Sequence, residues 1–236
     1  MGARSDCERS SIAHDDVMRR FILLAIACLA IACGPSAQAR PTVTPRPMGT
    51  LHTPSSYAVE FAIDQQVRVE YGTESQSFRA VVEKRGDRIV MIGLGPHGGR
   101  AFSLTQEGEV VTFDSQLPRE LPFPPEFMLM DLHRTWLKAV PHEGASMPDG
   151  EHEAFIDGET IREVWLGGRL QSRAFSIMTS NLAWWGVTVA YEGGLDFTPG
   201  AAAPSRVVIE CTMRVEDRTA GRPTYRLVLE GISINP

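Results

Sequence analysis

Apolar and polar residues alternate along most of the chain after residue 56. A period of two is typical of strands with one buried face. The predicted strands span residues 57–71, 78–82, 88–94, 100–106, 109–115, 153–156, 160–166, 170–178, 185–191, 207–213 and 225–232. Short turns separate them, and three are marked by dipeptides that favour hairpins, Asp157-Gly158, Gly167-Gly168 and Gly193-Gly194. The pattern predicts an antiparallel meander of about eleven strands.

One segment departs from this period, because residues 117–140 carry apolar side chains at helical spacing. Pro124 and Pro125 favour a helix start, where a missing N–H costs nothing. Pro141 favours a stop at the residue before it. A single amphipathic helix between two runs of strands predicts a mainly β, α+β fold, with a curved sheet and the helix as its plug or lid.

The two faces of this helix differ in polarity. Asp131, Arg134 and Lys138 share a polar arc, on which we expect Asp131 to be solvated or salt-bridged. His133 falls on the apolar side, as a partly buried histidine. The other residues of the apolar arc are Met128, Leu129, Met130, Leu132, Trp136 and Leu137. This arc either lines a hollow or seals a packed core, and methionines suit a hollow because they adapt to varied shapes.

Residues 1–33 resemble an export signal. A basic start at Met18, our expected initiation site, precedes an apolar run at 21–32, which is shorter than the roughly 20 residues a membrane span needs. The run ends in Leu-Ala-Ile-Ala-Cys, which resembles a bacterial lipobox and predicts lipidation of Cys33. In Gram-negative lipoproteins, the residue after the lipidated cysteine directs sorting between membranes. By resemblance to them, Gly34 favours placement in the outer membrane, facing the periplasm. The alternatives are cleavage at Ala39, giving a soluble periplasmic or secreted form, and an uncleaved anchor.

The remainder divides into a linker and one domain. Residues 34–56 are rich in Pro, Thr and Ser and predict a semi-extended tether. Residues 57–236 are enough for a single sizeable core. The net charge of −6 argues against a nucleic-acid partner. Once Cys33 is lipidated, Cys211 is the remaining cysteine, which excludes an internal disulfide and suggests a small buried side chain.

Several short motifs carry a resemblance to the LolA/LolB lipoprotein-carrier fold, and within it to a family of uncharacterised bacterial lipoproteins classed as a domain of unknown function. These motifs are Phe78-Arg79-Ala80, Gly93-Leu94-Gly95, residues 99–104, Leu-Pro-Phe-Pro-Pro-Glu-Phe at 121–127, Asp131-Leu132 and Tyr225-Arg226-Leu227. The resemblance covers residues 57–235. It implies a half-open antiparallel β-barrel with an apolar hollow, and lipid or lipoprotein handling in the envelope. His133 departs from it, since an amide is expected there.

The sequence offers little support for catalysis, a cofactor or a metal. Residues 93–98 fit G-x-G-x-x-G, but a strand pattern follows instead of the helix that a dinucleotide site requires, so we interpret them as a hairpin. Asp131 and His133 are two apart and do not share a helix face. His142 and His152 flank a loop at a spacing that fits no metal site.

Two functions therefore remain open. The first is a non-enzymatic outer-membrane lipoprotein that binds an acyl chain, a lipid or a lipidated envelope partner in its hollow, possible roles including lipoprotein or lipid transport. The predicted lining combines Met128, Leu129, Met130, Leu132 and Trp136 from the helix with Phe61, Phe78 and Phe102 from the sheet. The second is a structural or assembly lipoprotein, with a packed barrel that binds a protein partner through its surface.

Overall fold

The structure is a computed structural model of the 236-residue chain. It describes residues 49–117, 124–143, 147–178, 183–196, 198, 200–215 and 222–235. The expected signal segment, Cys33, Ala39 and residues 34–48 of the expected tether lie outside the described residues. The fold below belongs to the unit Pro41–Pro236. In the described part of this unit, no helix has the length and hydropathy needed to cross a membrane.

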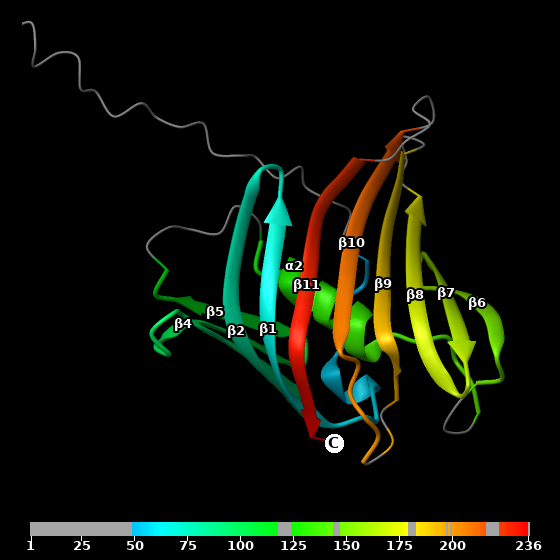
Figure 1. The fold of residues 1–236 in the computed structure, drawn as a ribbon, viewed down its shortest axis with the longest axis horizontal. Coiled ribbons are helices and arrows are strands. Elements are labelled where there is room, and N and C mark those ends of the chain that lie inside the picture. Colours follow the sequence, from blue (N-terminus) through cyan, green and yellow to red (C-terminus); the bar gives the residue numbers. More distant parts are fainter. Residues whose placement is uncertain are drawn as a thin grey trace, which may run out of the picture. The chain divides into compact units, whose positions relative to one another are not determined.

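Eleven antiparallel strands form one open sheet, as the alternating pattern predicts (Figure 1). They are β1 (Phe61–Tyr71), β2 (Glu74–Arg85), β3 (Arg88–Leu94), β4 (Arg100–Glu107), β5 (Val110–Ser115), β6 (Gly150–Ile156), β7 (Glu159–Leu166), β8 (Arg169–Met178), β9 (Ala183–Leu195), β10 (Arg206–Val215) and β11 (Arg222–Asn235). The sheet order is β5-β4-β3-β2-β1-β11-β10-β9-β8-β7-β6. The predicted fold class is confirmed, and the sheet is half-open because β5 and β6 are its two edges.

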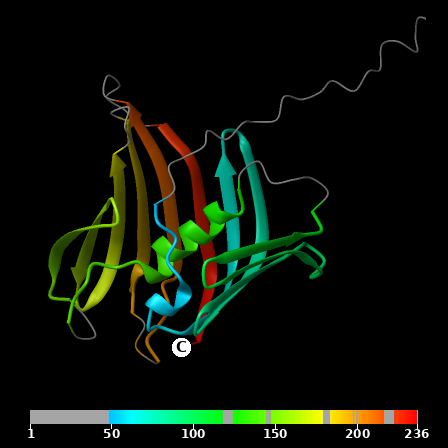
Figure 2. The ribbon, with the colours of Figure 1, turned by 180° about the vertical axis from the view of Figure 1, so that it is seen from behind.

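The chain order explains why a helix crosses this sheet. The first five strands run outward from the centre to the edge strand β5, and the last six run from the opposite edge, β6, back to the centre. The link from β5 to β6 must therefore pass from one edge to the other. The helical segment makes this passage across the concave face, as Figure 2 shows.

The helix is shorter than predicted and changes type along its length. It consists of α2 (Glu126–Leu132) and the π-helical turn η2 (His133–Leu137). The Lys138 N–H donates to the His133 carbonyl over 2.7 Å, and Lys138 itself is extended. The expected end at residue 140 is wrong, because side chains of the sheet bind carbonyls in the π-helical turn before Pro141 is reached. The Arg173 guanidinium donates to the Arg134 carbonyl, and the Tyr191 hydroxyl donates to that of Thr135.

The last residues of the expected tether belong to the fold. Residues 49–57, which include the 3₁₀ turn η1 (Pro54–Ser56), run across the concave side near the helix (Figure 2). The His52 carbonyl accepts a hydrogen bond from Gln106 Nε2 over 2.7 Å, and the Tyr57 carbonyl accepts one from Lys84 Nζ over 2.5 Å. Tyr57 also makes an edge-on ring contact with His133. These contacts make this stretch a packed cover and not a free spacer.

Two expectations from the sequence are corrected by the packing. The polar arc of the helix is not a solvent face, because Asp131, Arg134 and Lys138 are all buried, at 6%, 1% and 5% exposure. Each meets polar groups of the sheet, described below. The dipeptide Gly193-Gly194 is not a hairpin turn, since it lies inside β9 at positive φ, where the register with β8 shifts. The pair forms a bulge, which glycine permits without a steric penalty.

Candidate functional site

The concave face of the sheet contains a hollow of about 250 Å³ beside the first half of the helix. Its wall follows from the period of two, because Val67 on β1 lies opposite Phe78 on β2, and both side chains point inward. Neighbouring strands continue the wall in the same register. The apolar lining from the sheet comprises Val67, Val69, Phe78, Ala80, Met91, Ala101, Phe102, Trp185, Ile209, Leu227 and Leu229.

Three aromatic rings fix one side of the hollow. Phe102 on β4 lies opposite Gly93 on β3, and a Cβ atom on Gly93 would overlap the Phe102 ring. The absent side chain therefore lets the ring lie over β3. Phe102 stacks edge-on with Phe78 at 5.4 Å and packs against Phe113 at 5.9 Å, centroid to centroid. Such pairs add to the energy of burial and hold the wall in place.

The helix supplies the facing wall. Phe127, Met128, Leu132 and Trp136 project into the hollow from α2 and η2. Met128, Leu132 and Trp136 are four residues apart and so share one helix face, and Phe127 borders it. The helix therefore acts as a plug that fills part of the concave side and leaves a space beside its first turns.

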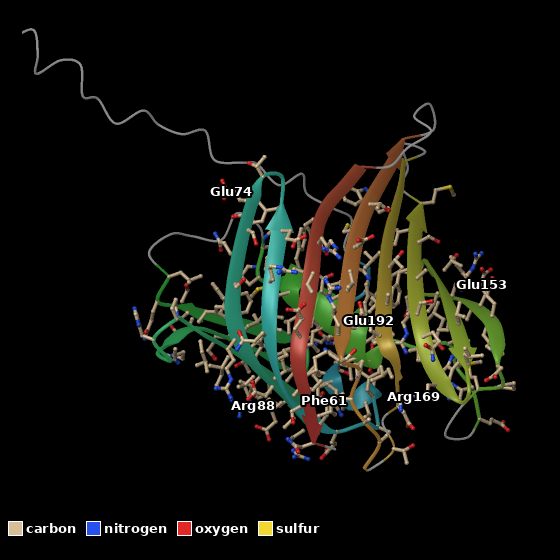
Figure 3. All side chains as sticks on the ribbon, in the orientation of Figure 1. Phe61, Glu74, Arg88, Glu153, Arg169 and Glu192 are labelled. Atoms are coloured by element: carbon tan, nitrogen blue, oxygen red, sulfur yellow. The ribbon has the colours of Figure 1, made fainter. Side chains whose placement is uncertain are left out.

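The lining of the hollow extends across the sheet from β4 to β9 and also along the strands. Its lining runs along β1 from Gln65 to Tyr71, a span of roughly 20 Å at strand rise. The rim lies by the β1–β2 hairpin, which Glu74 marks in Figure 3, and includes the exposed residues Gln76 and Pro96. Phe61 marks the opposite end of β1. A small volume spread over this length suits a narrow chain better than a compact ring system.

Polar groups interrupt the apolar lining. Asp131 on the helix accepts a hydrogen bond from the Tyr225 hydroxyl, which is shared between both carboxylate oxygens at 2.9 and 2.8 Å. Gln65 occupies the inward position between Ile63 and Val67 and is 4% exposed. No group among the described residues donates to its Oε1. Leaving a buried acceptor unsatisfied costs about 1–3 kcal/mol.

The second half of the helix meets a group of buried charges, here called the ionic cluster: Arg134, Lys138, Glu159, Glu163 and Arg173. Glu159 on β7 pairs with Arg134 through one oxygen and with Lys138 through the other, at 2.6 Å. Glu163, four residues further along β7, pairs with Arg173 of β8 at 2.6 Å. The cluster therefore ties the π-helical turn to β7 and β8.

The ionic cluster sets the charge state of its central carboxylate. Burial would raise the pKa of Glu159, but Arg134 and Lys138 outweigh this effect and hold the pKa below its ordinary value. Glu159 therefore remains an anion between two cations. Further contacts complete the packing: Trp165 Nε1 donates to Glu163, and the Arg134 guanidinium lies over the Phe175 ring at 5.6 Å.

His133 is buried where the two halves of the helix meet. Gln106 Nε2 donates to two carbonyls, so its Oε1 faces His133 Nε2 at 2.8 Å and accepts a hydrogen bond from it. Burial, together with the charges of Lys138 and His52, lowers the pKa of His133 to about 3. The ring is therefore neutral near pH 7, as a packed histidine and not a proton donor.

A family model described as "Protein of unknown function (DUF3261)" matches residues 62–184, which is more than half of the chain. The chain belongs to this family. The matched segment begins in β1 and ends in β9, so the DUF3261 match contains the helix, the ionic cluster, Gln65 and Asp131. The strands β10 and β11, which supply Tyr225, lie beyond it.

Other comparisons are weaker. A solved structure similar to this DUF3261 protein is the "LolA superfamily protein NE2245 from Nitrosomonas europaea", at 14% sequence identity and a TM-score of 0.38. That similarity covers 75% of this chain and 85% of the other. No curated protein matches the sequence.

The structure brings together five of the eight predicted hollow residues: Met128, Leu132, Trp136, Phe78 and Phe102. It places Phe61, Leu129 and Met130 elsewhere in the packed interior, all fully buried and outside the lining. Whether any of the eight binds a ligand stays a prediction. Sequence reasoning missed Gln65 and Tyr225 and placed Asp131 on a solvent-facing arc. The available signal was Gln65 itself, a polar residue at an inward position of an apolar strand.

The residues considered for acid–base catalysis or metal binding do not form hydrogen bonds with one another. Asp131 bonds Tyr225 and His133 bonds Gln106, so they do not form an acid–base pair. His142 and His152 each bond a nearby backbone carbonyl. Within the described residues, no group of three or more His, Cys, Asp or Glu side chains is placed to hold a metal ion. Residues 93–98 form the β3–β4 hairpin, as expected.

Proposed function

We propose that this DUF3261 protein is a non-enzymatic binding protein that holds one apolar chain, from a lipid or a lipidated partner, in the hollow. The observation that carries the proposal is the mainly apolar hollow of about 250 Å³ between the aromatic wall and the helix. It exceeds the roughly 150 Å³ of an apolar cavity known to bind benzene, and it is slightly smaller than typical drug-sized sites.

Binding is driven by removal of apolar surface from water, at about 25 cal/mol per Å². The ordering of the chain offsets part of this gain. The walls require little rearrangement, because ring contacts fix the sheet side and the ionic cluster fixes the helix. A preformed site of this kind keeps the cost of binding low.

The location of the protein belongs to the same proposal. A lipid on Cys33 would hold the domain at the outer membrane, facing the periplasm, where acyl chains and lipoproteins are present. An acyl chain alone gives marginal anchoring, so the diacylglyceryl group with a further amide-linked chain is the form expected to remain membrane-bound. Replacing Cys33 with Ser should release the protein from the envelope fraction, and retention of that variant would contradict lipid anchoring.

Native mass spectrometry of the purified protein, without added ligand, tests the binding proposal. Co-purified lipid at about one molecule per chain would support it and identify the ligand class. A ligand-free mass, with no uptake when an apolar fluorophore such as phenylnaphthylamine is titrated, would contradict it. The outcome separates a binding hollow from an empty packing defect.

One observation favours the alternative of a surface that binds a protein partner. Phe155 on β6 and Leu166 on β7 are 74% and 64% exposed, and β6 is an edge strand. Exposed apolar residues beside a free edge are features of interaction sites. Cross-linking in intact cells, compared with Phe155→Ser, tests it: a partner captured through β6 should be lost in the variant.

A further inference from the structure

The width of the hollow depends on how far apart the two arms of the open sheet lie. One arm consists of β2–β5 and the other of β6–β9, and β5 and β6 are the two edges of the sheet. The lining takes residues from both arms, such as Phe78 and Phe102 from the first and Trp185 from the second. A contact that holds the arms together across the open side therefore limits the space available to a ligand.

Residues 49–57, here called the clasp, contact both arms at the end of the hollow away from the rim (Figure 2). His52 meets the two arms by itself. Its carbonyl accepts a hydrogen bond from Gln106 on β4 over 2.7 Å, and its Nε2 lies 2.7 Å from Asp157 Oδ2 in the β6–β7 turn. The Ser55 N–H adds a contact to the β2–β3 turn over 3.0 Å. The clasp therefore joins strands that are far apart in the sheet order.

The start of the clasp fits closely against the ionic cluster. A Cβ atom on Gly49 would overlap the Glu159 carboxylate. This carboxylate cannot move aside at low cost, because Arg134 and Lys138 both bind it. Glycine therefore allows the clasp to lie against β7, and a larger side chain at this position would lift the clasp away from the second arm.

The hollow between the arms has room for a single chain. An apolar cavity of roughly 150 Å³ holds benzene, which has six carbons. In the same proportion, the hollow of about 250 Å³ holds about ten carbons, which corresponds to one chain and not to two. A second chain would require the arms to separate.

We propose that the clasp restricts the hollow to one chain by holding the two arms at a fixed separation. This inference rests on the proposed function and adds the class of ligand, since a lipid with two or three chains is held by one of them while the others stay outside. His52 and Gly49 lie outside the lining and act as positioning residues. Release of the clasp widens the hollow and admits a second chain.

Two probes that differ by one chain test this proposal on the intact protein: decanoyl-lysophosphatidylcholine and didecanoylphosphatidylcholine, both kept monomeric. Each competes with phenylnaphthylamine. In the natural chain, the two should displace the fluorophore at concentrations within about threefold of each other, because the second chain finds no apolar surface to cover. In His52→Ala and in Gly49→Val, the two-chain probe should become roughly tenfold more effective, which is the gain expected from burying about two further methylenes.

Matched variants separate the width of the hollow from general stability. Ser56→Ala removes a bond that stays within the clasp, and Gly99→Val adds a side chain where no atom lies within 4 Å, so both should keep the natural ratio of the two probes. His52→Gln can still donate to Asp157 and should also keep it. A loss of stability alone would weaken both probes alike and would leave their ratio unchanged.

The separation of the arms can also be measured without a ligand. Spin-labelled unnatural amino acids at Val110 on β5 and Phe155 on β6 would report it, because both side chains are exposed on the edge strands. The distance between the labels should increase in His52→Ala and in Gly49→Val. It should stay unchanged in Ser56→Ala.

The outcomes separate this inference from the proposed function. A label distance or a probe ratio that stays unchanged in both clasp variants would overturn the role of the clasp. A natural chain that already binds the two-chain probe tenfold more tightly would overturn the single-chain limit while supporting a binding hollow. Failure of the fluorophore and of both probes to bind the natural chain would overturn the proposed function, and the label distances would still test the clasp.

Discussion

The two halves of the buried helix differ in what they meet. The first half, with Met128 and Leu132, borders a space that the sheet does not fill. The second half lies against the ionic cluster, where Glu159 and Arg173 bind side chains and carbonyls of the π-helical turn. Both halves are buried to a similar extent, but the hollow lies mainly beside the first half and reaches only Thr135 and Trp136 of the second.

This difference indicates that the second half of the helix positions it, while the first half borders the hollow. Paired buried charges require close geometry and are costly to separate. They fix the position and rotation of the helix without using the apolar surface of its first half. A helix held only by apolar packing could slide into the space and close it. The charged side therefore keeps the apolar side open.

The largest expected effect comes from removing the centre of the ionic cluster. Glu159→Gln leaves the buried Arg134 and Lys138 without their anion. Breaking a buried pair in this way costs about 3–5 kcal/mol, so the free energy of unfolding in urea should fall by that order. The exposed pair between Glu153 and Arg162 provides a control, since Glu153→Gln should cost under about 1 kcal/mol. If both variants lost the same free energy of unfolding, the ionic cluster would not stabilise the helix more than an exposed ion pair does.

The second effect is on pH dependence and concerns His133. Its pKa is about 3 in the folded chain, below the ordinary 6.5, so the unfolded chain binds a proton that the folded chain does not. Stability should therefore fall as pH falls through this window, by up to about 1.4 kcal/mol per pH unit. The lowered pKa of Glu159 acts in the same direction, but only below its ordinary value of 4.5.

His133→Gln isolates this contribution, because the amide keeps a donor for Gln106 and does not titrate. Unfolding in urea between about pH 6 and pH 5 should show a shallower slope in the variant than in the natural chain. His97→Gln, in the exposed β3–β4 loop, is the matched control and should keep the full slope. An unchanged slope in His133→Gln would show that the ring is not held neutral by burial.

The third effect is on ligand binding alone. Val69 lines the hollow near its rim and is only partly buried, so Val69→Trp should fill the space without disturbing the ionic cluster. We expect roughly tenfold weaker binding of phenylnaphthylamine, with the free energy of unfolding unchanged within about 1 kcal/mol. Val110→Trp, on the exposed end of β5, should leave binding unaltered. Full affinity in Val69→Trp would place the bound probe elsewhere.

Most of the fold could be predicted from the sequence, because the period of two and the turn residues are local signals. Strands such as β3 and β8 begin and end within one residue of their predicted limits. The exception is Gly193-Gly194, whose turn chemistry also suits a bulge. Which role is used depends on the pairing of β8 with β9, a non-local property that the dipeptide does not encode.

The candidate site was less predictable than the fold, because it also depends on contacts between residues far apart in the sequence. A helical wheel assigns polar residues to solvent, and this holds for a helix with one free face. Here residues 49–57 and the sheet enclose the helix, so Asp131, Arg134 and Lys138 are buried and find partners far away in the sequence. Such partners depend on sheet topology, which a single helix pattern cannot reveal.

The smallest effect is expected where the two halves of the helix meet. The side chain of Thr135 lines the hollow and donates to the Asp131 carbonyl over 2.6 Å, while the Thr135 carbonyl accepts from Tyr191. Thr135→Val keeps the shape and the Tyr191 contact but loses the hydroxyl. Stability should fall by about 1 kcal/mol or less in urea unfolding, and phenylnaphthylamine should bind slightly more tightly to the less polar wall.

Thr112→Val, at an exposed position of β5, is the control and should change neither quantity. A loss as large as that of Glu159→Gln would mean that this hydroxyl, and not the ionic cluster, determines where the π-helical turn begins. The helix would then be positioned by its own local bonds, and the open space beside its first half would not depend on charges at its second. A small loss, with the hollow still able to bind the probe, is what a helix held by the ionic cluster requires.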